Sequence, residues 1–392
     1  MIGKMKINNE LSKIKEENEF FILSEKVKKF KEKNPNCEII SLGIGDVSKP
    51  IIKPIIKAMH NAVDDLSSME TFRGYGASYG YDFLKQKIIE IDYKNMDFTL
   101  DEIYISNGTK IDVCSILELF DINSTICIPT PIYPIYKNGV HCLSRNINCF
   151  PIFEKDNFVP QVPKEKYDII YLCSPNNPTG IAYSYEDLKK WVDYAIKNNA
   201  IILYDNAYNA FINSPNIPKS IYEIESANRI AIEFRSFSKN ISFSGVRCSY
   251  YVIPNKIYDD INKIWKKRTI NRFNGADYIA QKGAEASYLK EAQKEIKENI
   301  RDYLKNTKRL KNVFENLGFT VYGGKDSPFL WVKIKENINS WDLFNLYLKE
   351  LNIIIIPGII FGVEGDNFFR ISGLGSRENI EKAIDRLEQY YN

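Results

Sequence analysis

The stretch Phe234-Arg-Ser-Phe-Ser-Lys-Asn-Ile-Ser-Phe-Ser-Gly-Val-Arg-Cys248 lies between two apolar runs, Ile230-Ala-Ile-Glu-Phe234 and Tyr250-Tyr-Val-Ile253. Both runs have the composition of buried strands. Between them a lone lysine, Lys239, follows two serines, and Arg247 comes eight residues later. Polar groups directly after a buried strand are typical of ligand sites in α/β sheets, so the stretch predicts a binding or catalytic loop.

Strand and helix patterns alternate around this stretch, from about residue 100 to residue 255. Strands are predicted over residues 102–106, 125–128, 167–173, 200–204, 230–234 and 250–253, and helices over 111–120 and 184–196. The second helix begins with a capping box, Ser184-Tyr-Glu-Asp187. This alternation predicts an α/β fold in which helices cover both faces of a mostly parallel sheet.

The pattern changes beyond residue 288, where a second, smaller α+β domain is predicted. Its expected elements are a helix over 288–317, strands over 329–334, 352–356 and 368–372, a helix over 340–351 and a final helix capped by Ser376. A helical pattern over 23–32 is expected to pack with them. The predicted domains are therefore a large one over 47–287 and a small, discontinuous one over 1–46 and 288–392.

The charge balance argues against nucleic-acid binding. The 53 basic and 50 acidic residues nearly cancel, and the basic ones are scattered along the chain rather than gathered in a stripe. Small-molecule partners are expected instead. The longest aliphatic run, residues 353–356, is too short to span a bilayer, and the N-terminal segment has no apolar signal core. We therefore expect no membrane association and a cytoplasmic location.

Cysteines and histidines indicate no metal site. The seven cysteines are odd in number and lack metal-ligand spacing, so they are interpreted as reduced thiols of the core. The two histidines, His60 and His141, are far apart and have no acidic or cysteine companions. His-centred metal sites and Ser-His-Asp hydrolase sites are therefore not expected, and both histidines are interpreted as structural.

Polar motifs follow four of the predicted strands. They are Ser106-Asn-Gly-Thr-Lys110, Cys173-Ser-Pro-Asn-Asn-Pro-Thr-Gly180, Asp205-Asn-Ala-Tyr208 and Ser236-Phe-Ser-Lys239. Taken singly, each is compatible with a structural role, such as a helix N-cap for Asp205 or a solvated loop lysine for Lys239. Because the carboxyl ends of parallel strands meet at one edge of a sheet, the motifs together predict one site. The first motif, a small-residue turn that enters a helix, is suited to binding a phosphate.

The chain resembles the fold-type I pyridoxal-phosphate (PLP) aminotransferases through Asn177-Pro-Thr-Gly180, Asp205-x-x-Tyr208, Ser236-x-Ser-Lys239 with Arg247, and Phe369-Arg370. Within that class the chain is most similar to the LL-diaminopimelate aminotransferases, through motifs spread over nearly its whole length. These motifs are Leu42-Gly-Ile-Gly-Asp46, Phe72-Arg-Gly-Tyr-Gly76, Glu233-Phe-Arg-Ser-Phe-Ser-Lys239, Arg272-Phe-Asn-Gly275, Gln281-Lys-Gly-Ala-Glu-Ala286 and Gly375-Ser-Arg-Glu-Asn379. The resemblance implies a large domain with a mostly parallel seven-stranded sheet, a smaller α+β domain, PLP as cofactor and transamination between an amino acid and a 2-oxo acid.

The resemblance also implies roles for the cofactor residues. Lys239 would carry PLP covalently and then move the proton at the substrate Cα. Asp205 would hold the pyridine nitrogen protonated, and Tyr208 would hydrogen-bond the phenolic oxygen, so these three are the predicted catalytic residues. The further predicted cofactor contacts are Asn177 at the phenolic oxygen, Tyr133 on the ring face, Gly108, Thr109, Ser236, Ser238 and Arg247 at the phosphate, and also Lys110 and Tyr75.

Substrate residues follow from the same resemblance. The predicted substrate contacts are Gly45, Tyr75, Lys110, Tyr133, Asn177, Asn274 and Arg370. Arg370 would bind the α-carboxylate bidentately, beside a backbone N–H of Gly45, and Lys110 would lie near the distal end of the substrate. Tyr75 and Asn274 match residues that a neighbouring subunit contributes in the family. The resemblance therefore implies a homodimer with shared active sites.

The chain departs from the family pattern where the substrate is recognised. Ser78, in Gly74-Tyr-Gly-Ala-Ser-Tyr-Gly80, replaces a family glutamate thought to recognise the distal amino group. The segments Asn240-Ile-Ser-Phe-Ser244 and Pro357-Gly-Ile-Ile-Phe-Gly362 also differ, and Asn18 falls where the family has a tyrosine. An ammonium without an anionic partner is costly to bury. We therefore predict LL-diaminopimelate as the leading substrate, with reduced selectivity.

Two alternatives stay open on the sequence. One is an aminotransferase, or a PLP lyase of the same fold, that acts on another amino acid. The other, more remote, is a catalytically silent PLP-binding regulatory protein, against which the presence of Lys239, Asp205 and Arg370 argues.

Overall fold

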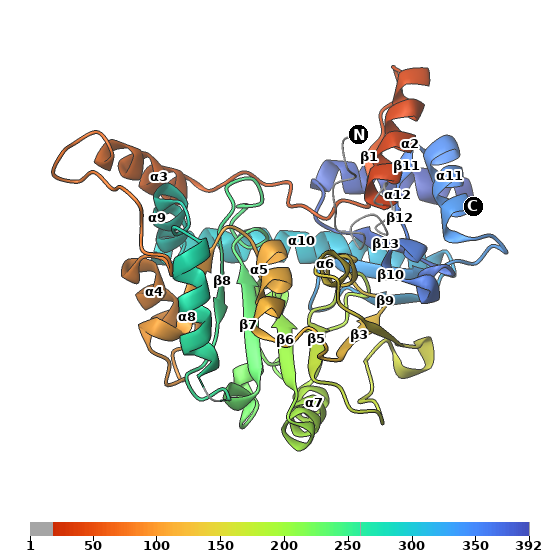
Figure 1. Ribbon diagram of the computed structural model, residues 1–392. Helices are drawn as coiled ribbons and strands as arrows, with labels where there is room; N and C mark the ends of the chain where they lie inside the picture. Colours follow the sequence, from red (N-terminus) through yellow and green to blue (C-terminus); the bar gives the residue numbers. More distant parts are fainter. Residues whose placement is uncertain (1–18, 259, 392) are drawn as a thin grey trace, which may run out of the picture.

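A seven-stranded sheet is the centre of the larger part of the computed structural model, which describes residues 19–258 and 260–391 (Figure 1). Its strands are β2 (Ile103–Ser106), β3 (Ile126–Thr130), β4 (Asn148–Pro151), β5 (Ile169–Cys173), β6 (Ile201–Asp205), β7 (Ala231–Ser236) and β8 (Ser249–Val252), in the order β2-β8-β7-β6-β5-β3-β4. Neighbours from β7 to β4 run parallel, and β8 is antiparallel to both β2 and β7. The predicted mostly parallel sheet is confirmed.

Both faces of this sheet are covered, which explains why its central strands are apolar throughout rather than alternating. In β5, Ile169 and Tyr171 pack into a core with Trp265, whereas Ile170 and Leu172 point to the opposite core with Trp191. The helices of this part are α3 (Lys53–Asp65), α4 (Asp82–Asp92), α5 (Thr109–Ser115), α6 (Ile135–Cys142), α7 (Tyr185–Asn198), α8 (Ile261–Arg272) and α9 (Tyr278–Ala286). Short 3-10 helices lie at Leu100–Glu102, Ile116–Leu119, Glu154–Asp156, Asn209–Phe211, Ile221–Glu223 and Ala227–Arg229.

A four-stranded antiparallel sheet organises the smaller part. It has the order β12 (Ile356–Pro357), β13 (Phe368–Ser372), β10 (Phe329–Lys333) and β9 (Val321–Gly323). Around it lie the helices α2 (Glu19–Lys33), α11 (Ser340–Leu346), which continues as a π-helical turn (Tyr347–Leu351), and α12 (Arg377–Tyr391), with 3-10 helices at Gly358–Phe361 and Val363–Gly365. Leu23 of α2 belongs to the core of this part, so the N-terminal helix packs where the sequence predicted.

The predicted single strand over 352–356 is wrong. The chain forms two short strands there, and they belong to different sheets. Strand β11 (Ile353–Ile354) pairs in parallel with β1 (Ile40–Ser41), whereas β12 pairs with β13. An unbroken run of isoleucines shows that the segment is buried, but it does not show that the chain changes partner within it.

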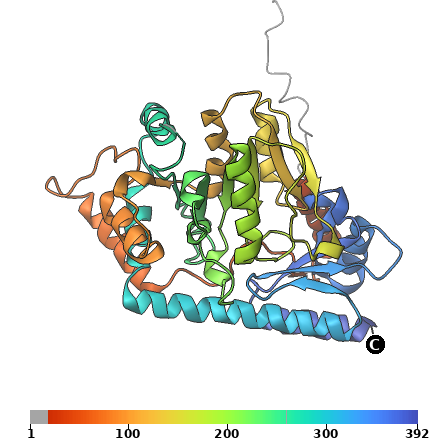
Figure 2. The same ribbon diagram turned by 90° about the horizontal axis from the view of Figure 1, so that it is seen from below.

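The long helix α10 (Lys290–Asn316) connects the two parts, and Figure 2 shows it passing along both of them. Its first half contributes Ile296 and Ile300 to a core of the larger part, and its second half contributes Leu310 and Phe314 to the core of the smaller part. Because α10 is shared, the boundary near residue 288 stays a prediction about where the domains divide.

Two cysteines are not the core residues that the sequence suggested. All seven are free thiols, but Cys142 and Cys149 are exposed. His60 and His141 are exposed as well. Across residues 19–258 and 260–391, no helix combines the length and hydropathy needed to cross a membrane.

Candidate active site

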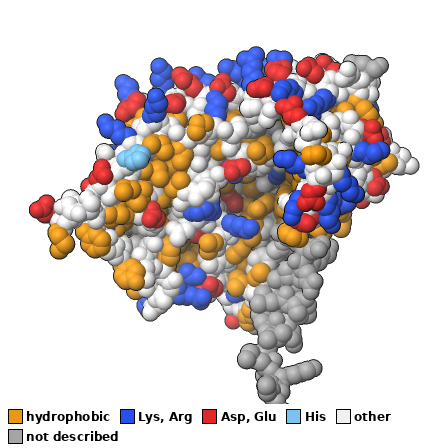
Figure 3. Space-filling view, turned by 90° about the horizontal axis from the view of Figure 1, so that it is seen from above, with side chains coloured by type: hydrophobic (Ala, Val, Ile, Leu, Met, Phe, Trp, Pro, Cys, Tyr) orange, Lys and Arg blue, Asp and Glu red, His pale blue; other side chains and the backbone are white. Residues whose placement is uncertain are grey.

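A cavity of about 470 Å³ lies at the carboxyl ends of β5, β6 and β7, where the larger and smaller parts meet. The view from above shows a hollow near the centre of this face, where charged side chains lie among hydrophobic ones (Figure 3). The predicted site residues that line the cavity are Gly45, Thr109, Lys110, Tyr133, Asn177, Asp205, Tyr208, Ser236, Ser238, Lys239, Arg247 and Arg370. The structure thus brings together side chains from both parts.

One end of the cavity is suited to a phosphate group. Thr109, Ser236 and Ser238 are buried hydroxyls, and Arg247 supplies a positive charge beside them. Gly108 has a φ of 133°, and a Cβ at this position would lie 1.9 Å from Nη2 of Arg247. A glycine is therefore required for the guanidinium to approach the first turn of α5.

The middle of the cavity holds a buried carboxyl group. Oδ1 of Asp205 accepts a hydrogen bond from the Ala207 backbone N–H at 3.0 Å, and Oδ2 accepts one from the Tyr136 hydroxyl at 2.6 Å. Burial raises the pKa of Asp205 to about 6, although the Tyr136 hydrogen bond opposes that rise. A cationic ring nitrogen beside this carboxylate would remove the cost of its burial.

Lys239 lines the same cavity, and its side chain is largely but not fully buried, with 17% of it exposed. Burial lowers the pKa of Lys239, and Asp46, whose Oδ1 accepts a hydrogen bond from Nζ at 3.2 Å, opposes that change. The other oxygen of Asp46 accepts a hydrogen bond from the Ser244 hydroxyl at 2.7 Å. These two hydrogen bonds attach Asp46, and with it the segment that links the two parts, to the lysine loop.

Arg370, on β13, reaches the cavity from the smaller part. Its Nη1 donates to Oδ1 of Asn177 at 2.7 Å, and its Nη2 donates to the Gly43 carbonyl at 2.9 Å. Its Nε has no hydrogen-bond partner within the described part of the chain. The guanidinium lies over the rings of Phe329 and Phe361, at 4.6 and 5.1 Å, and burial lowers its pKa to about 10. A buried arginine with an unused donor is suited to binding a carboxylate.

Three of the cavity residues that were not predicted as site residues contact predicted ones. Asp46 belongs to the motif Leu42-Gly-Ile-Gly-Asp46, and Tyr136, in the first turn of α6, follows Tyr133 by three positions, so both had a weak signal in the sequence. Phe20, on α2, lines the cavity and packs against Tyr133, with ring centroids 6.2 Å apart. Nothing in the local sequence around Phe20 indicates that position.

Tyr75 and Asn274 do not line the cavity of their own chain. Both are exposed, Tyr75 to 92%. Ser78 is partly exposed and also lies outside the cavity. Asn18 falls outside the described residues. The cavity of one chain therefore contains the predicted cofactor residues except Tyr75 and Gly108, and the latter lies directly behind Arg247.

The fold and these groups define a fold-type I PLP enzyme. The groups that fit the four parts of that cofactor are the phosphate-binding residues, the buried carboxyl of Asp205 for the ring nitrogen, the phenol of Tyr208 and the partly buried amine of Lys239. Burial raises the pKa of Tyr208, which keeps its hydroxyl protonated as a donor. When bound, PLP supplies an electron sink for the substrate Cα.

Comparison with known proteins agrees with this class. The family model described as aminotransferase class I and II matches residues 38–387. The chain is 41% identical to an LL-diaminopimelate aminotransferase of Methanosphaera stadtmanae, over 98% of this chain and 99% of that protein, and 41% identical to one of Lawsonia intracellularis, over 94% and 95%. The solved L,L-diaminopimelate aminotransferase of Chlamydomonas reinhardtii superposes with a TM-score of 0.94 at 36% identity and full coverage of both chains. The chain belongs to the class I and II aminotransferases, which depend on PLP.

Proposed function

We propose that this aminotransferase moves the amino group of LL-diaminopimelate, its leading substrate, to a 2-oxo acid. The observation that carries the proposal is one cavity that contains the amine of Lys239, the carboxyl of Asp205 and the partly unpaired guanidinium of Arg370. The 41% identity to proteins named LL-diaminopimelate aminotransferase supports the substrate.

A panel of amino acids and 2-oxo acids tests the proposal. An isotope-labelled amino nitrogen should pass from LL-diaminopimelate to a 2-oxo acid acceptor. Transfer from other amino acids but not from LL-diaminopimelate would contradict the substrate and leave transamination standing. Release of ammonia in place of transfer would favour a lyase of the same fold.

The residues of the cavity would have separate roles in transamination. Burial favours the neutral form of the Lys239 amine, which can accept the proton from the substrate Cα. Arg370 would hold the α-carboxylate through the donors that Asn177 and Gly43 do not occupy. The rings of Phe329 and Phe361 shield that ion pair from water, which strengthens it. Tyr133 would lie against the cofactor ring.

We further propose that the active unit is a homodimer. The connection between α3 and α4 projects away from the large sheet (Figure 1) and carries Met69, Phe72 and Tyr75, which are 97%, 61% and 92% exposed. Apolar side chains gathered on a projecting segment favour burial against another protein surface. In this proposal the segment enters the active site of a second copy, so Tyr75 and Lys239 of one site come from different chains.

Mixing two inactive variants tests that arrangement. When Tyr75→Ala and Lys239→Ala subunits exchange, each heterodimer has one site free of both substitutions, and activity should return. The matched control mixes Lys239→Ala with Asp205→Asn, two substitutions on the same chain's cavity, and should recover nothing. If subunit exchange is demonstrated and only background activity is found in both mixtures, the sites are built within single chains.

Selectivity for the second amine should be relaxed. Ser78 does not line the cavity of its own chain. Because it lies on the same segment as Tyr75, it would reach the active site of the partner chain in the dimer. A hydroxyl can accept a hydrogen bond from an ammonium but supplies no charge. The distal amino group should therefore contribute less to binding than it would beside a glutamate.

Ser78→Glu is expected to shift preference toward LL-diaminopimelate by roughly 1–3 kcal/mol, the contribution of a charge-assisted hydrogen bond. The measurement is the ratio of kcat/KM for LL-diaminopimelate to that for 2-aminopimelate, which lacks the second amine. Ser78→Gln, similar in size to the glutamate but uncharged, is the matched control and should change the ratio little. A wild-type protein that already discriminates sharply, with no gain in Ser78→Glu, would show that another residue recognises the amine.

The cytoplasmic location stays a prediction.

A further inference from the structure

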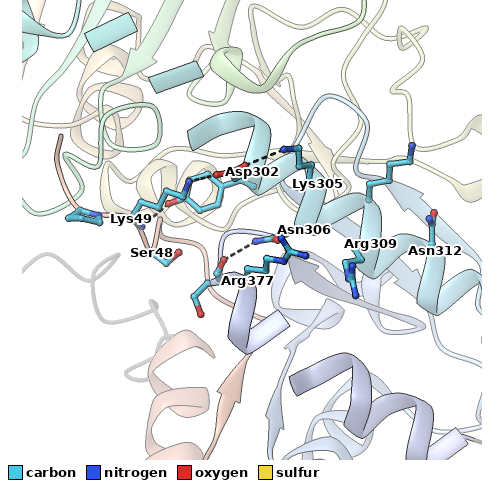
Figure 4. A pocket seen from close by; sticks show the side chains of 13 residues that line it. Ser48, Lys49, Asp302, Lys305, Asn306, Arg309, Asn312 and Arg377 are labelled. Carbon is cyan, nitrogen blue, oxygen red and sulfur yellow. Dashed lines mark hydrogen bonds and ion pairs between the residues drawn. The ribbon is translucent and has the colours of Figure 1, made fainter. Parts of the chain in front are cut away.

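A second cavity, of about 590 Å³, lies where residues 48–50 meet α10 and the first turn of α12 (Figure 4). Within residues 19–258 and 260–391, it shares no lining residue with the active-site cavity. Two of its walls belong to α10 and to the segment that leads from the smaller part of the chain to the larger one. The third wall is formed by the first three residues of the motif Gly375-Ser-Arg-Glu-Asn379, which do not line the active-site cavity.

This second cavity is named the hinge cavity because residues 48–50 lie on the segment that joins the two parts, and positive charge dominates its lining. Among the described residues, its cationic lining residues are Lys49, Lys305, Lys308, Arg309 and Arg377, and its one lining carboxylate is Asp302. Asp302 pairs with Lys49 at 2.6 Å and with Lys305 at 3.5 Å, as the dashed lines in Figure 4 show. The cations therefore outnumber the carboxylate even before any ligand is considered.

The other three cations, Lys308, Arg309 and Arg377, have few acidic partners to balance their charge. Arg309 and Arg377 share one carboxylate, Glu381, which does not line the cavity. Lys308 has no ion pair within residues 19–258 and 260–391. Like charges held around one hollow repel each other, and an anion in the hollow would relieve that repulsion.

The walls of the cavity are held in place by hydrogen bonds. The buried Asn306 side chain donates to the carbonyls of Gly373 and Gly375, at 3.3 and 3.1 Å, and so ties α10 to the start of α12. The Lys49 backbone N–H donates to the Tyr303 hydroxyl at 2.7 Å, which ties residues 48–50 to the same helix. The cations are thus carried on a fixed frame rather than on loose loops, which lowers the entropic cost of binding.

We propose that the hinge cavity binds a small, multiply charged oxyanion, of the phosphate or polycarboxylate class. Such an anion can accept hydrogen bonds from several of these side chains at once, and its charge matches their excess. The proposal is independent of the substrate of the active site.

Calorimetric titration of the PLP-loaded protein tests the proposal, with inorganic pyrophosphate as the probe and citrate as the polycarboxylate arm. PLP fills the phosphate end of the active site, and sodium chloride keeps the ionic strength constant. The double variant Lys308→Gln, Arg377→Gln should bind the probe at least about tenfold more weakly, since two charge-assisted contacts are lost. Both side chains are exposed, so the fold should not depend on them.

Lys294→Gln is the matched control, because it removes one exposed lysine from the same helix outside the cavity and should leave the affinity unchanged. Hydrogen exchange with the probe present should show protection at residues 48–50 and 375–380. Equal affinity of the double variant, an equal loss in Lys294→Gln, or protection confined to residues 236–247 would each overturn the proposal. Tighter binding of pyrophosphate than of citrate would support the phosphate class, and the reverse would support the polycarboxylate class.

Discussion

Lys239→Ala is expected to lower kcat by at least about four orders of magnitude, because one side chain provides both the covalent attachment of the cofactor and the base at the substrate Cα. The amine lies inside the cavity, where burial lowers its pKa. Lys110 is the other lysine that lines the cavity among the described residues, and it is exposed on α5. It should not replace Lys239.

A chemical label locates the lysine independently of activity. Borohydride reduction of the PLP-loaded protein, followed by peptide mapping, should place the pyridoxyl group on Lys239. Lys110→Ala is the control and should carry the label at the same position. A label on Lys110 or on any other lysine in the wild-type protein would refute the assignment.

Asp205→Asn is expected to lower kcat by at least about two orders of magnitude, because an amide cannot hold the cofactor ring nitrogen protonated and the electron sink weakens. Tyr136→Phe is the matched variant, since it removes the hydrogen bond to Asp205 but leaves the charge. The decrease of kcat in Tyr136→Phe should be smaller, about tenfold, which corresponds to the contribution of one hydrogen bond. Turnover of Asp205→Asn close to that of the wild type would show that the carboxylate does not face the cofactor ring.

The carboxyl group of Asp205 should also affect the free energy of unfolding of the cofactor-free protein. Burial raises the pKa of Asp205 from its ordinary value of 3.8 to about 6, so the folded state favours the protonated form. Stability from this group is therefore complete below about pH 4 and is lost as the pH rises through 6. At pH 8 the cofactor-free Asp205→Asn protein should be more stable than wild type by on the order of 2–3 kcal/mol, measured by denaturant unfolding. An unchanged or lower stability would contradict the burial of an unpaired charge.

The strand-end residues of the larger part could be predicted from the sequence because each follows a recognisable buried strand. Asp205 ends β6, and Ser236 ends β7, so their positions on one sheet edge follow from parallel pairing. The partners of these residues could not be predicted in the same way. Tyr136 reaches Asp205 only because α6 packs over the sheet, and neither residue's local pattern specifies that packing.

The sequence by itself determined the fold class and the lysine loop, because strand periodicity and strand-end chemistry are local properties that a short window displays. The cofactor followed from the resemblance of the sequence motifs to those of the fold-type I aminotransferases. The tertiary structure alone decided how the two parts complete one site. Arg370 contacts Asn177 and Lys239 contacts Asp46 across 193 residues of chain in each case, and Phe20 closes the cavity from α2. It also showed that the chain's own cavity excludes Tyr75 and Ser78, and that five cations converge on the hinge. Contacts between residues so far apart depend on how whole cores pack against each other, and no short stretch of sequence encodes that packing.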